Sequence, residues 1–151
     1  MKLTSPAFTE GTEIPAEYTG KGANSNPPLQ WSGTPMDAKS LVLLVEDLDA
    51  EPEPWTHWLV FNIPPTTTQV IAGKVPLDSV EGLANGGTHP YEGPNPKYFT
   101  GVHHYKFTLY ALDALLDLPA ESDKKAVLPA MEGHVIDQAV LTGICTSPAA
   151  A

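Results

Sequence analysis

A chain of 151 residues is long enough to fill the core of one domain, and we expect a single domain over residues 1–151. Its composition is 42% hydrophobic and 17% charged with 12 glycines and 16 prolines, which excludes a disordered chain and favours a β-rich fold with many turns. The formal net charge of -10 argues against a general electrostatic surface for nucleic acid or anionic lipid, because both are negatively charged.

The cysteine count and the hydropathy pattern bear on location. The one cysteine, Cys145, cannot form a disulfide within the chain, so an oxidising compartment is not implied and we expect a cytoplasmic protein. The first residues lack the apolar segment of a secretory leader, and no stretch approaches the roughly 20 apolar residues that span a bilayer. An acidic chain can still hold a small anion if histidines and backbone N–H groups supply the donors.

The first residues are predicted to form short β structure. Apolar and polar residues alternate from residue 3 to residue 18, which indicates an edge hairpin with Phe8, Ile14 and Tyr18 facing inward. A polar loop over residues 20–28 ends in two prolines and leads into Trp31, which we expect to lie beneath that loop.

Two apolar runs in the middle of the chain predict two buried strands. Residues 41–45 are apolar without alternation, which is typical of a central strand covered on both faces. Residues 57–63 form the second strand, and counting by twos places Leu59, Phe61 and Ile63 on the same face as His57. His57 then lies at the end of a row that faces the core.

Residues 66–101 carry weaker signals. Short strand fragments are expected at residues 70–73 and 75–77, and residues 86–101 hold too much glycine and proline for regular structure. We predict a long surface loop there, packed through Tyr91, Tyr98 and Phe99.

Residues 102–112 give the clearest strand of the sequence. Alternation predicts a buried row that consists of His103, Tyr105, Phe107, Leu109 and Ala111. Neighbouring residues of a strand point to opposite faces, so His103 joins the core side and His104 the solvated side. The two histidines therefore cannot serve the same site.

The end of the chain is predicted to hold a short helix and a closing strand. Ser122 and Asp123 resemble a helix start with an N-cap and an acid in the first turn, and Pro129 either kinks one helix or begins a second. Residues 139–146 form the closing strand, with Gly143 as a local irregularity, and residues 147–151 form a frayed tail.

Several polar residues fall in segments whose other residues demand burial: Asp47, Asp49, His57, His103 and Tyr105. Buried polar groups are costly unless they are hydrogen-bonded, so these groups must satisfy one another or bind a ligand. The residues alone leave both readings open, because histidines can be hydrogen-bonded within a core and aspartates can cap turns.

An ordered set of motifs runs through nearly the whole chain, from about Phe8 to Gly143. It consists of residues 27–31, 40–50, 57–64, 91–96, 101–107 and 133–135. In this set the chain resembles the phosphatidylethanolamine-binding protein family, whose members are also called Raf kinase inhibitor proteins, and most of all its compact bacterial and archaeal branch.

The resemblance implies a mainly β fold, an antiparallel β-sandwich with one or two short helices near the C-terminus. It also implies a small anion pocket near one end. The residues that match the family's site are Asp47, Asp49, His57, Gly93, Pro94, His103 and Tyr105. Protonated histidines, the tyrosine hydroxyl and loop N–H groups would donate to a phosphate-like group, and the aspartates would bind an amine head.

The chain departs from the family pattern in three places. Family members usually have Asp-Pro-Asp-Ala-Pro, whereas residues 47–51 of this chain have leucine and glutamate in place of the two prolines. The glutamate, Glu51, adds a negative charge at the rim of the pocket, which should weaken anion binding. His104 stands where arginine is common, and we expect it to contact the scaffold rather than the ligand. Asn95 and Lys97 replace a commoner cysteine and proline.

The resulting hypothesis is a non-enzymatic protein that binds a small anionic or phosphorylated ligand without a cofactor. The first alternative is a regulator that binds a kinase or protease through the loop at residues 91–99. The second is a metal-assisted hydrolase, since two aspartates and two histidines form a plausible ligand set. Nucleophilic catalysis is disfavoured, because no Gly-x-Ser-x-Gly motif occurs and Cys145 lies in an apolar strand. The resemblance also makes a homodimer a hypothesis.

Overall fold

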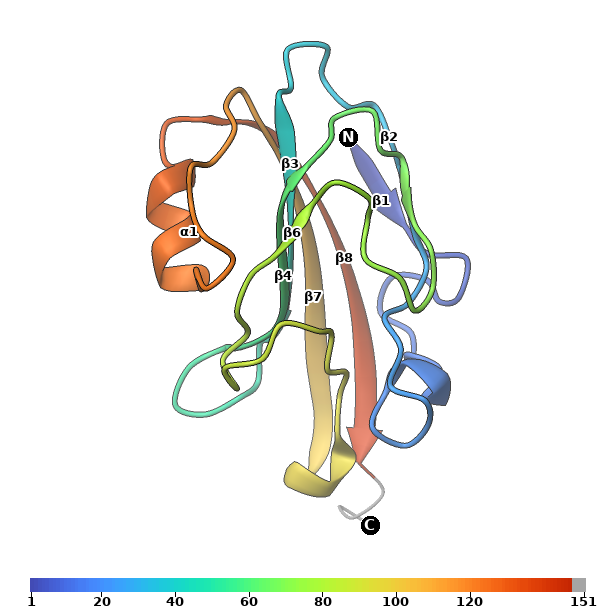
Figure 1. Cartoon of the computed structure of the whole chain (residues 1–151). Coiled ribbons are helices and arrows are strands. Elements are labelled where there is room, and N and C mark those ends of the chain that lie inside the picture. The colour runs from blue at the N-terminus through green and yellow to red at the C-terminus, as the bar shows by residue number, and fades with distance from the viewer. Residues whose placement is uncertain (148–151) are drawn as a thin grey trace.

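Two antiparallel β-sheets and one α-helix form the chain in the computed structural model, which describes residues 1–147 (Figure 1). The five-stranded sheet has the order β6-β4-β3-β7-β8, and the three-stranded sheet has the order β1-β2-β5. The strands are β1 (Lys2–Thr4), β2 (Leu29–Ser32), β3 (Ser40–Asp47), β4 (Trp55–Ile63), β5 (Gln69–Val70), β6 (Val80–Glu81), β7 (Gly101–Leu112) and β8 (Val135–Ser147). The helices are the 3₁₀ turns η1 (Ala16–Tyr18) and η2 (Pro96–Tyr98), and α1 (Lys124–Met131). The predicted fold class is confirmed.

β3 is the central strand that the apolar run predicted. It pairs with β4 on one side and with β7 on the other, and all its residues are buried. Leu41, Leu43 and Val45 join the core between the two sheets, while Val42 and Leu44 join the core beneath α1. An uninterrupted apolar run is what a strand covered on both faces requires.

β4 does not keep the alternation that the sequence predicted. Its register against β3 shifts twice, and at each shift β4 holds one residue more than β3, which defines a β-bulge. His57 is the extra residue at the first bulge, so it lies on the face of Trp58 rather than on that of Leu59 and Phe61. The predicted row was therefore wrong, since Leu59 and Phe61 pack beneath α1.

β7 confirms the predicted alternation, because Tyr105, Phe107, Leu109 and Ala111 all lie in the core between the sheets. β8 begins earlier than predicted and pairs with β7 with a single register shift, between Ala111 and Leu112. The predicted irregularity at Gly143 was wrong, since Gly143 pairs regularly with Tyr105.

Packing explains the glycine at position 143. A Cβ there would lie 2.6 Å from Cγ1 of Ile14 and 2.8 Å from Cε2 of Phe8. Both side chains belong to the N-terminal segment, which crosses β8 at this point. Glycine therefore permits the close approach of two segments that are far apart in the sequence.

The N-terminal segment is not the predicted edge hairpin. β1 pairs with β2, and residues 11–14 continue along the outer edge of β8. The Gly11 N–H donates to the Thr142 carbonyl at 2.7 Å, and the Ile14 N–H donates to the Ile144 carbonyl at 2.8 Å. The predicted burial of Phe8, Ile14 and Tyr18 is confirmed. Trp31 is also buried, and its indole N–H donates to the Thr67 carbonyl.

α1 covers the other face of the five-stranded sheet (Figure 1). The predicted helix start is confirmed, but the N-cap is Asp123, whose carboxylate accepts from the Ala126 N–H at 3.1 Å, so the acid caps the helix rather than lying in its first turn. Pro129 lies inside a single helix and does not begin a second one. Val127 and Met131 are the buried residues of α1.

The remaining predictions concern short elements and the tail. β5 and β6 are two-residue strands, and the predicted fragment at residues 75–77 is not a strand. Ser147 belongs to β8 and is buried, whereas the rest of the predicted tail lies outside the described residues. Across residues 1–147, none of the helices has the length and apolar character to cross a membrane.

The crossing at Gly143 predicts a large difference between two identical substitutions. Gly143→Ala should lower the free energy of unfolding by about 1–3 kcal/mol, because the added methyl group overpacks the core beside Ile14 and Phe8. Gly86→Ala is the matched control, since its Cβ would meet nothing closer than Thr88 Oγ1 at 4.0 Å. Urea unfolding measures the free energy of unfolding of both variants, and equal midpoints for Gly143→Ala and Gly86→Ala would contradict the packing argument.

Candidate functional site

A cavity of about 650 Å³ opens where β3 ends and where β4 and β7 begin. This is the lower end of the five-stranded sheet in Figure 1, next to η2. Six of the seven predicted site residues line it: Asp47, Asp49, His57, Gly93, His103 and Tyr105. The antiparallel order brings them together, because the end of β3 lies beside the start of both neighbouring strands.

His103 is held by a carboxylate and by an aromatic ring. Its Nδ1 lies 2.7 Å from Oδ2 of Asp47, and the Asp47 side chain is 7% exposed. The Phe99 ring stacks on the imidazole with centroids 3.9 Å apart and an interplanar angle of 21°. An ionised carboxylate only accepts, so Nδ1 carries the proton and Nε2 is left to contact a ligand.

His57 is held in a similar way from the other wall. Its Nδ1 lies 2.6 Å from the carbonyl oxygen of Glu92, which can only accept, so Nδ1 donates. The ring meets Tyr105 edge to face with centroids 5.3 Å apart. Burial lowers the pKa of His57, against the opposing effect of the Glu92 carbonyl and of the Asp47 charge. His57 is therefore neutral at pH 7, with Nε2 as an acceptor.

Tyr105 supplies a hydroxyl donor. The residue is 1% exposed, and burial raises the pKa of its phenol, with a further increase from the nearby charge of Asp47. A phenol whose pKa is raised stays protonated at every pH at which the protein is studied.

Asp49 is held by His104. Its Oδ2 accepts from the His104 backbone N–H at 2.6 Å and lies 2.8 Å from Nδ1 of the His104 ring. Burial acts to raise the pKa of Asp49, but these hydrogen bonds outweigh it and the net pKa is lowered. His104 does not itself line the cavity, as expected from strand parity, but it holds Asp49, which does.

Asp47 combines the two roles that the sequence left open. Its Oδ1 accepts from the Asp49 backbone N–H at 2.9 Å, which is turn chemistry, while Oδ2 engages His103. The turn that orders the loop after β3 thereby also positions the ring of His103.

The loop residues contribute differently from what the resemblance implied. The Gly93 N–H donates to Oδ1 of Asn24 at 2.7 Å, so it is already used within the protein. A Cβ on Gly93 would lie 2.1 Å from the Tyr18 carbonyl oxygen, which is why glycine is needed there. Pro94 does not line the cavity, and its carbonyl accepts from the Gly20 N–H.

Sequence reasoning left Asn24, Glu92 and Phe99 out of the site, although all three line the cavity, and it expected Trp55 only as a core or pocket-wall residue. Asn24 lies in a polar loop without any periodic pattern, and only its contact with Gly93 reveals its place. Trp55 pairs with Asp47 at the start of β4, two residues before the predicted strand begins. β3 also runs two residues further than predicted, to Asp47, and Trp55 is the residue of β4 that pairs with Asp47.

The cavity is acidic. Of the described residues that line it, none is lysine or arginine, whereas Glu51 and Glu92 add to the two aspartates. Glu51 thus lies on the cavity wall, as expected for the residue that replaces a proline. Tyr98 also lines the cavity but is 83% exposed, so its predicted role in packing the loop was wrong. Tyr91 does pack the loop, because its hydroxyl donates to the Tyr18 carbonyl at 2.8 Å.

The geometry also bears on metal binding and on nucleophilic catalysis by cysteine. In the part of the chain that the structure describes, no three His, Cys, Asp or Glu side chains are grouped so that they could hold a metal ion. Cys145 is buried in β8, and burial raises the pKa of its thiol, which disfavours the reactive thiolate.

Comparison with known proteins gives consistent matches over almost the whole chain. The family model described as phosphatidylethanolamine-binding protein matches residues 4–146. The UPF0098 protein of Methanothermobacter thermautotrophicus is 48% identical over 149 residues, which cover 95% of this chain and 97% of the relative. A Mycobacterium tuberculosis relative, whose name describes a lipoprotein, is 38% identical over 95% of this chain and 71% of its own length.

Solved structures agree with these matches. A phosphatidylethanolamine-binding protein homolog from Chlamydia trachomatis superimposes with a TM-score of 0.89 at 39% identity, covering 95% of both chains. Escherichia coli YbcL, described as a member of the mammalian family, gives a TM-score of 0.88 at 28% identity, covering 96% of this chain and 97% of its own.

The environment of His57 predicts its titration. Its pKa in the folded protein should lie below the ordinary 6.5, with the neutral ring protonated on Nδ1, and ring ¹⁵N shifts measure both. The unfolded chain then binds more protons at this position, so the contribution of His57 to stability falls as the pH drops below about 6.5. A pKa above 6.5 or an Nε2-protonated ring would contradict the assignment.

Proposed function

The chain belongs to the phosphatidylethanolamine-binding protein family, and from this premise we propose that it is a non-enzymatic protein whose cavity binds a small phosphorylated ligand. One observation carries the proposal. His57 and His103 each use Nδ1 on the scaffold, so the two Nε2 atoms are left for a ligand on the wall of one cavity. Tyr105, whose ring meets that of His57 edge to face, lines the same cavity and adds a hydroxyl donor.

Binding of a phosphate monoester would bring a proton into the cavity. The second pKa of such an ester is about 6, so near neutral pH the ligand itself can carry the proton that a neutral Nε2 accepts. The Asp47 carboxylate lies 2.7 Å from Nδ1 of His103 and so leaves Nε2 of that ring for the phosphoryl group. Affinity for the phosphoryl group should therefore rise as the pH falls.

The acidic wall favours a ligand that also carries an amine. A free phosphate would meet Asp49, Glu51 and Glu92 without any compensating cation. An ammonium group next to the phosphoryl group would pair with these carboxylates and could lie against the Trp55 ring. We therefore expect phosphorylethanolamine to bind more tightly than inorganic phosphate.

Titration with both compounds tests the proposal through the histidine NMR signals. His57 and His103 should shift in a saturable way, and His103→Gln should weaken phosphorylethanolamine binding about tenfold, because a charge-assisted hydrogen bond is lost. His134→Gln is the matched control, since His134 forms a similar pair with Asp113 at 2.8 Å outside the cavity. Unmoved ring signals at millimolar ligand would reject the site.

A second candidate function rests on the exposure of Tyr98. This aromatic ring is 83% exposed on η2, at the mouth of the cavity, where a protein partner such as a kinase or protease could bury it. Exposed aromatic residues are enriched among the anchors of protein interfaces.

The cytoplasmic location and the homodimer also stay predictions from the sequence.

A binding assay against a panel of purified kinases and proteases tests this candidate. Tyr98→Ala should reduce recovery of a bound partner, by about tenfold if the ring is an interface anchor. Leu77→Ala serves as control, because Leu77 is also exposed, at 85%, and does not line the cavity. Equal recovery with both variants would remove the loop from consideration.

A further inference from the structure

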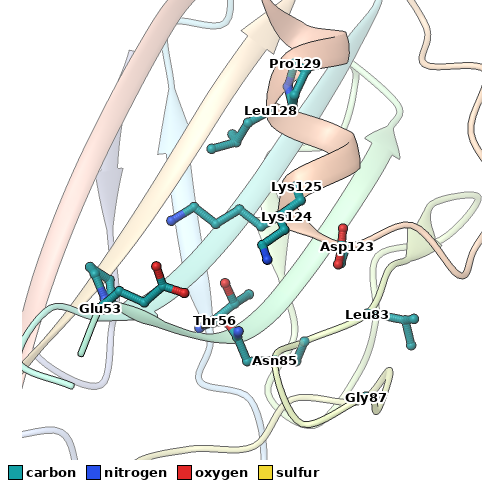
Figure 2. A pocket seen from close by; sticks show the side chains of 12 residues that line it. Glu53, Thr56, Leu83, Asn85, Gly87, Asp123, Lys124, Lys125, Leu128 and Pro129 are labelled. Carbon is teal, nitrogen blue, oxygen red and sulfur yellow. Dashed lines mark hydrogen bonds between the residues drawn. The ribbon is translucent and has the colours of Figure 1, made fainter. Parts of the chain in front are cut away.

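A second cavity, of about 540 Å³, lies between the start of α1 and the loops that flank β4 and β6 (Figure 2). Its walls include Leu83, Leu128 and Pro129, which are apolar, and its charged residues include Glu53 and Lys125. The cavity thus combines an apolar surface with charges of both signs.

This cavity lies on the opposite face of the five-stranded sheet from the site described above. Trp55 and His57 line the first cavity, whereas Thr56, between them in β4, lines the second. Thr56 pairs with Glu46, whose carboxylate bonds to Lys124 of α1, while the next residue of β3, Asp47, faces His103. The two sites share no lining residue.

Thr56, which lines the second cavity, carries a buried hydroxyl. Thr56 is 1% exposed, and within residues 1–147 its Oγ1 has no hydrogen-bond partner. Its backbone is fixed from both sides by Asn85, which accepts from the Thr56 N–H at 2.6 Å and donates to the Thr56 carbonyl at 3.1 Å. An unpaired buried hydroxyl costs free energy, and a polar ligand atom would relieve that cost.

Two of the four charged residues around the cavity are already engaged. Lys124 forms an ion pair with Glu46, and the Asp123 carboxylate caps the first turn of α1. Glu53 and Lys125 have no such partner among the described residues, and they come from different segments, the loop before β4 and the exposed side of α1. Figure 2 shows Thr56 and Asn85 beneath the first turn of α1, with Glu53 to one side.

We propose that this cavity binds a small zwitterion with an apolar side chain, of the chemical class of the free α-amino acids. The carboxylate pairs with Lys125 and approaches Thr56 and Asn85, and the ammonium group pairs with Glu53. The side chain packs on Leu83, Leu128 and Pro129, where burial of apolar surface adds to the affinity. A ligand with a single charge would leave either Glu53 or Lys125 without its partner.

Three ligands of similar shape separate these contributions. L-leucine carries both charges, 4-methylpentanoate carries only the carboxylate, and 3-methylbutylamine carries only the amine. In ¹H–¹⁵N spectra at pH 7, leucine should move the backbone signals of Asn85 and Lys125 in a saturable way. Each singly charged analogue should bind about tenfold more weakly, because one charge-assisted contact is lost.

Substitutions at the two charges complete the test. Glu53→Gln should weaken leucine about tenfold and leave 4-methylpentanoate unchanged, and Lys125→Gln should have the reverse selectivity, leaving 3-methylbutylamine unchanged. Glu132→Gln and Lys74→Gln are matched controls, because both residues are exposed and do not line the cavity.

Three outcomes would overturn the proposal: no saturable shift at about 10 mM leucine, a range that covers weak sites; equal affinity for all three ligands; or leucine affinity that neither substitution changes. Shifts confined to the rings of His57 and His103 would also overturn it, since they would place leucine in the other cavity. Because the two cavities share no lining residue, these outcomes are independent of phosphate binding at His57 and His103.

Discussion

The complete burial of β3 is the constraint on which the rest of the structure depends. All residues from Ser40 to Asp47 are buried, so both faces of this strand must be covered by other parts of the chain. The N-terminal residues and the small sheet cover one face, and α1 covers the other. Polar side chains are costly along such a strand, so they gather where it ends. Asp47 lies at that end, beside the first residues of β4 and β7, and this is where the cavity lined by six of the predicted site residues opens.

The bulge at His57 determines how β4 serves both faces of the sheet. Without the extra residue, strict alternation would turn His57 toward α1, the face on which Leu59 and Phe61 pack. With it, Trp55 and His57 both line the cavity beside Tyr105, while Thr56 faces the cavity beside α1. Bulges are common next to sites because they redirect one side chain without moving the strand. Three consecutive residues thereby reach two separate cavities.

The cavity differs in its charge from an anion site lined by basic side chains. The cavity wall holds the Nε2 atoms of two histidines and four carboxylates, and none of its described lining residues is lysine or arginine. The Nδ1 atoms of the two rings are held by acceptors, the Glu92 carbonyl and the Asp47 carboxylate, so the rings are oriented without a lysine or arginine beside them. The site chemistry therefore differs from that of phosphate sites built on arginine, which stay charged at every accessible pH.

The sequence by itself determined the elements whose pattern is local. The apolar run of β3, the alternation of β7 and the helix start at Asp123 each depend on neighbouring residues. The resemblance of the sequence to a family supplied the site residues, six of which line one cavity. Only the tertiary structure decided the bulge at His57, the path of the N-terminal segment along β8 and the use of the Gly93 N–H by Asn24. These features depend on register and contact between segments far apart in the chain. Such contacts leave no periodic trace in the sequence, because geometry selects them only after the strands have paired.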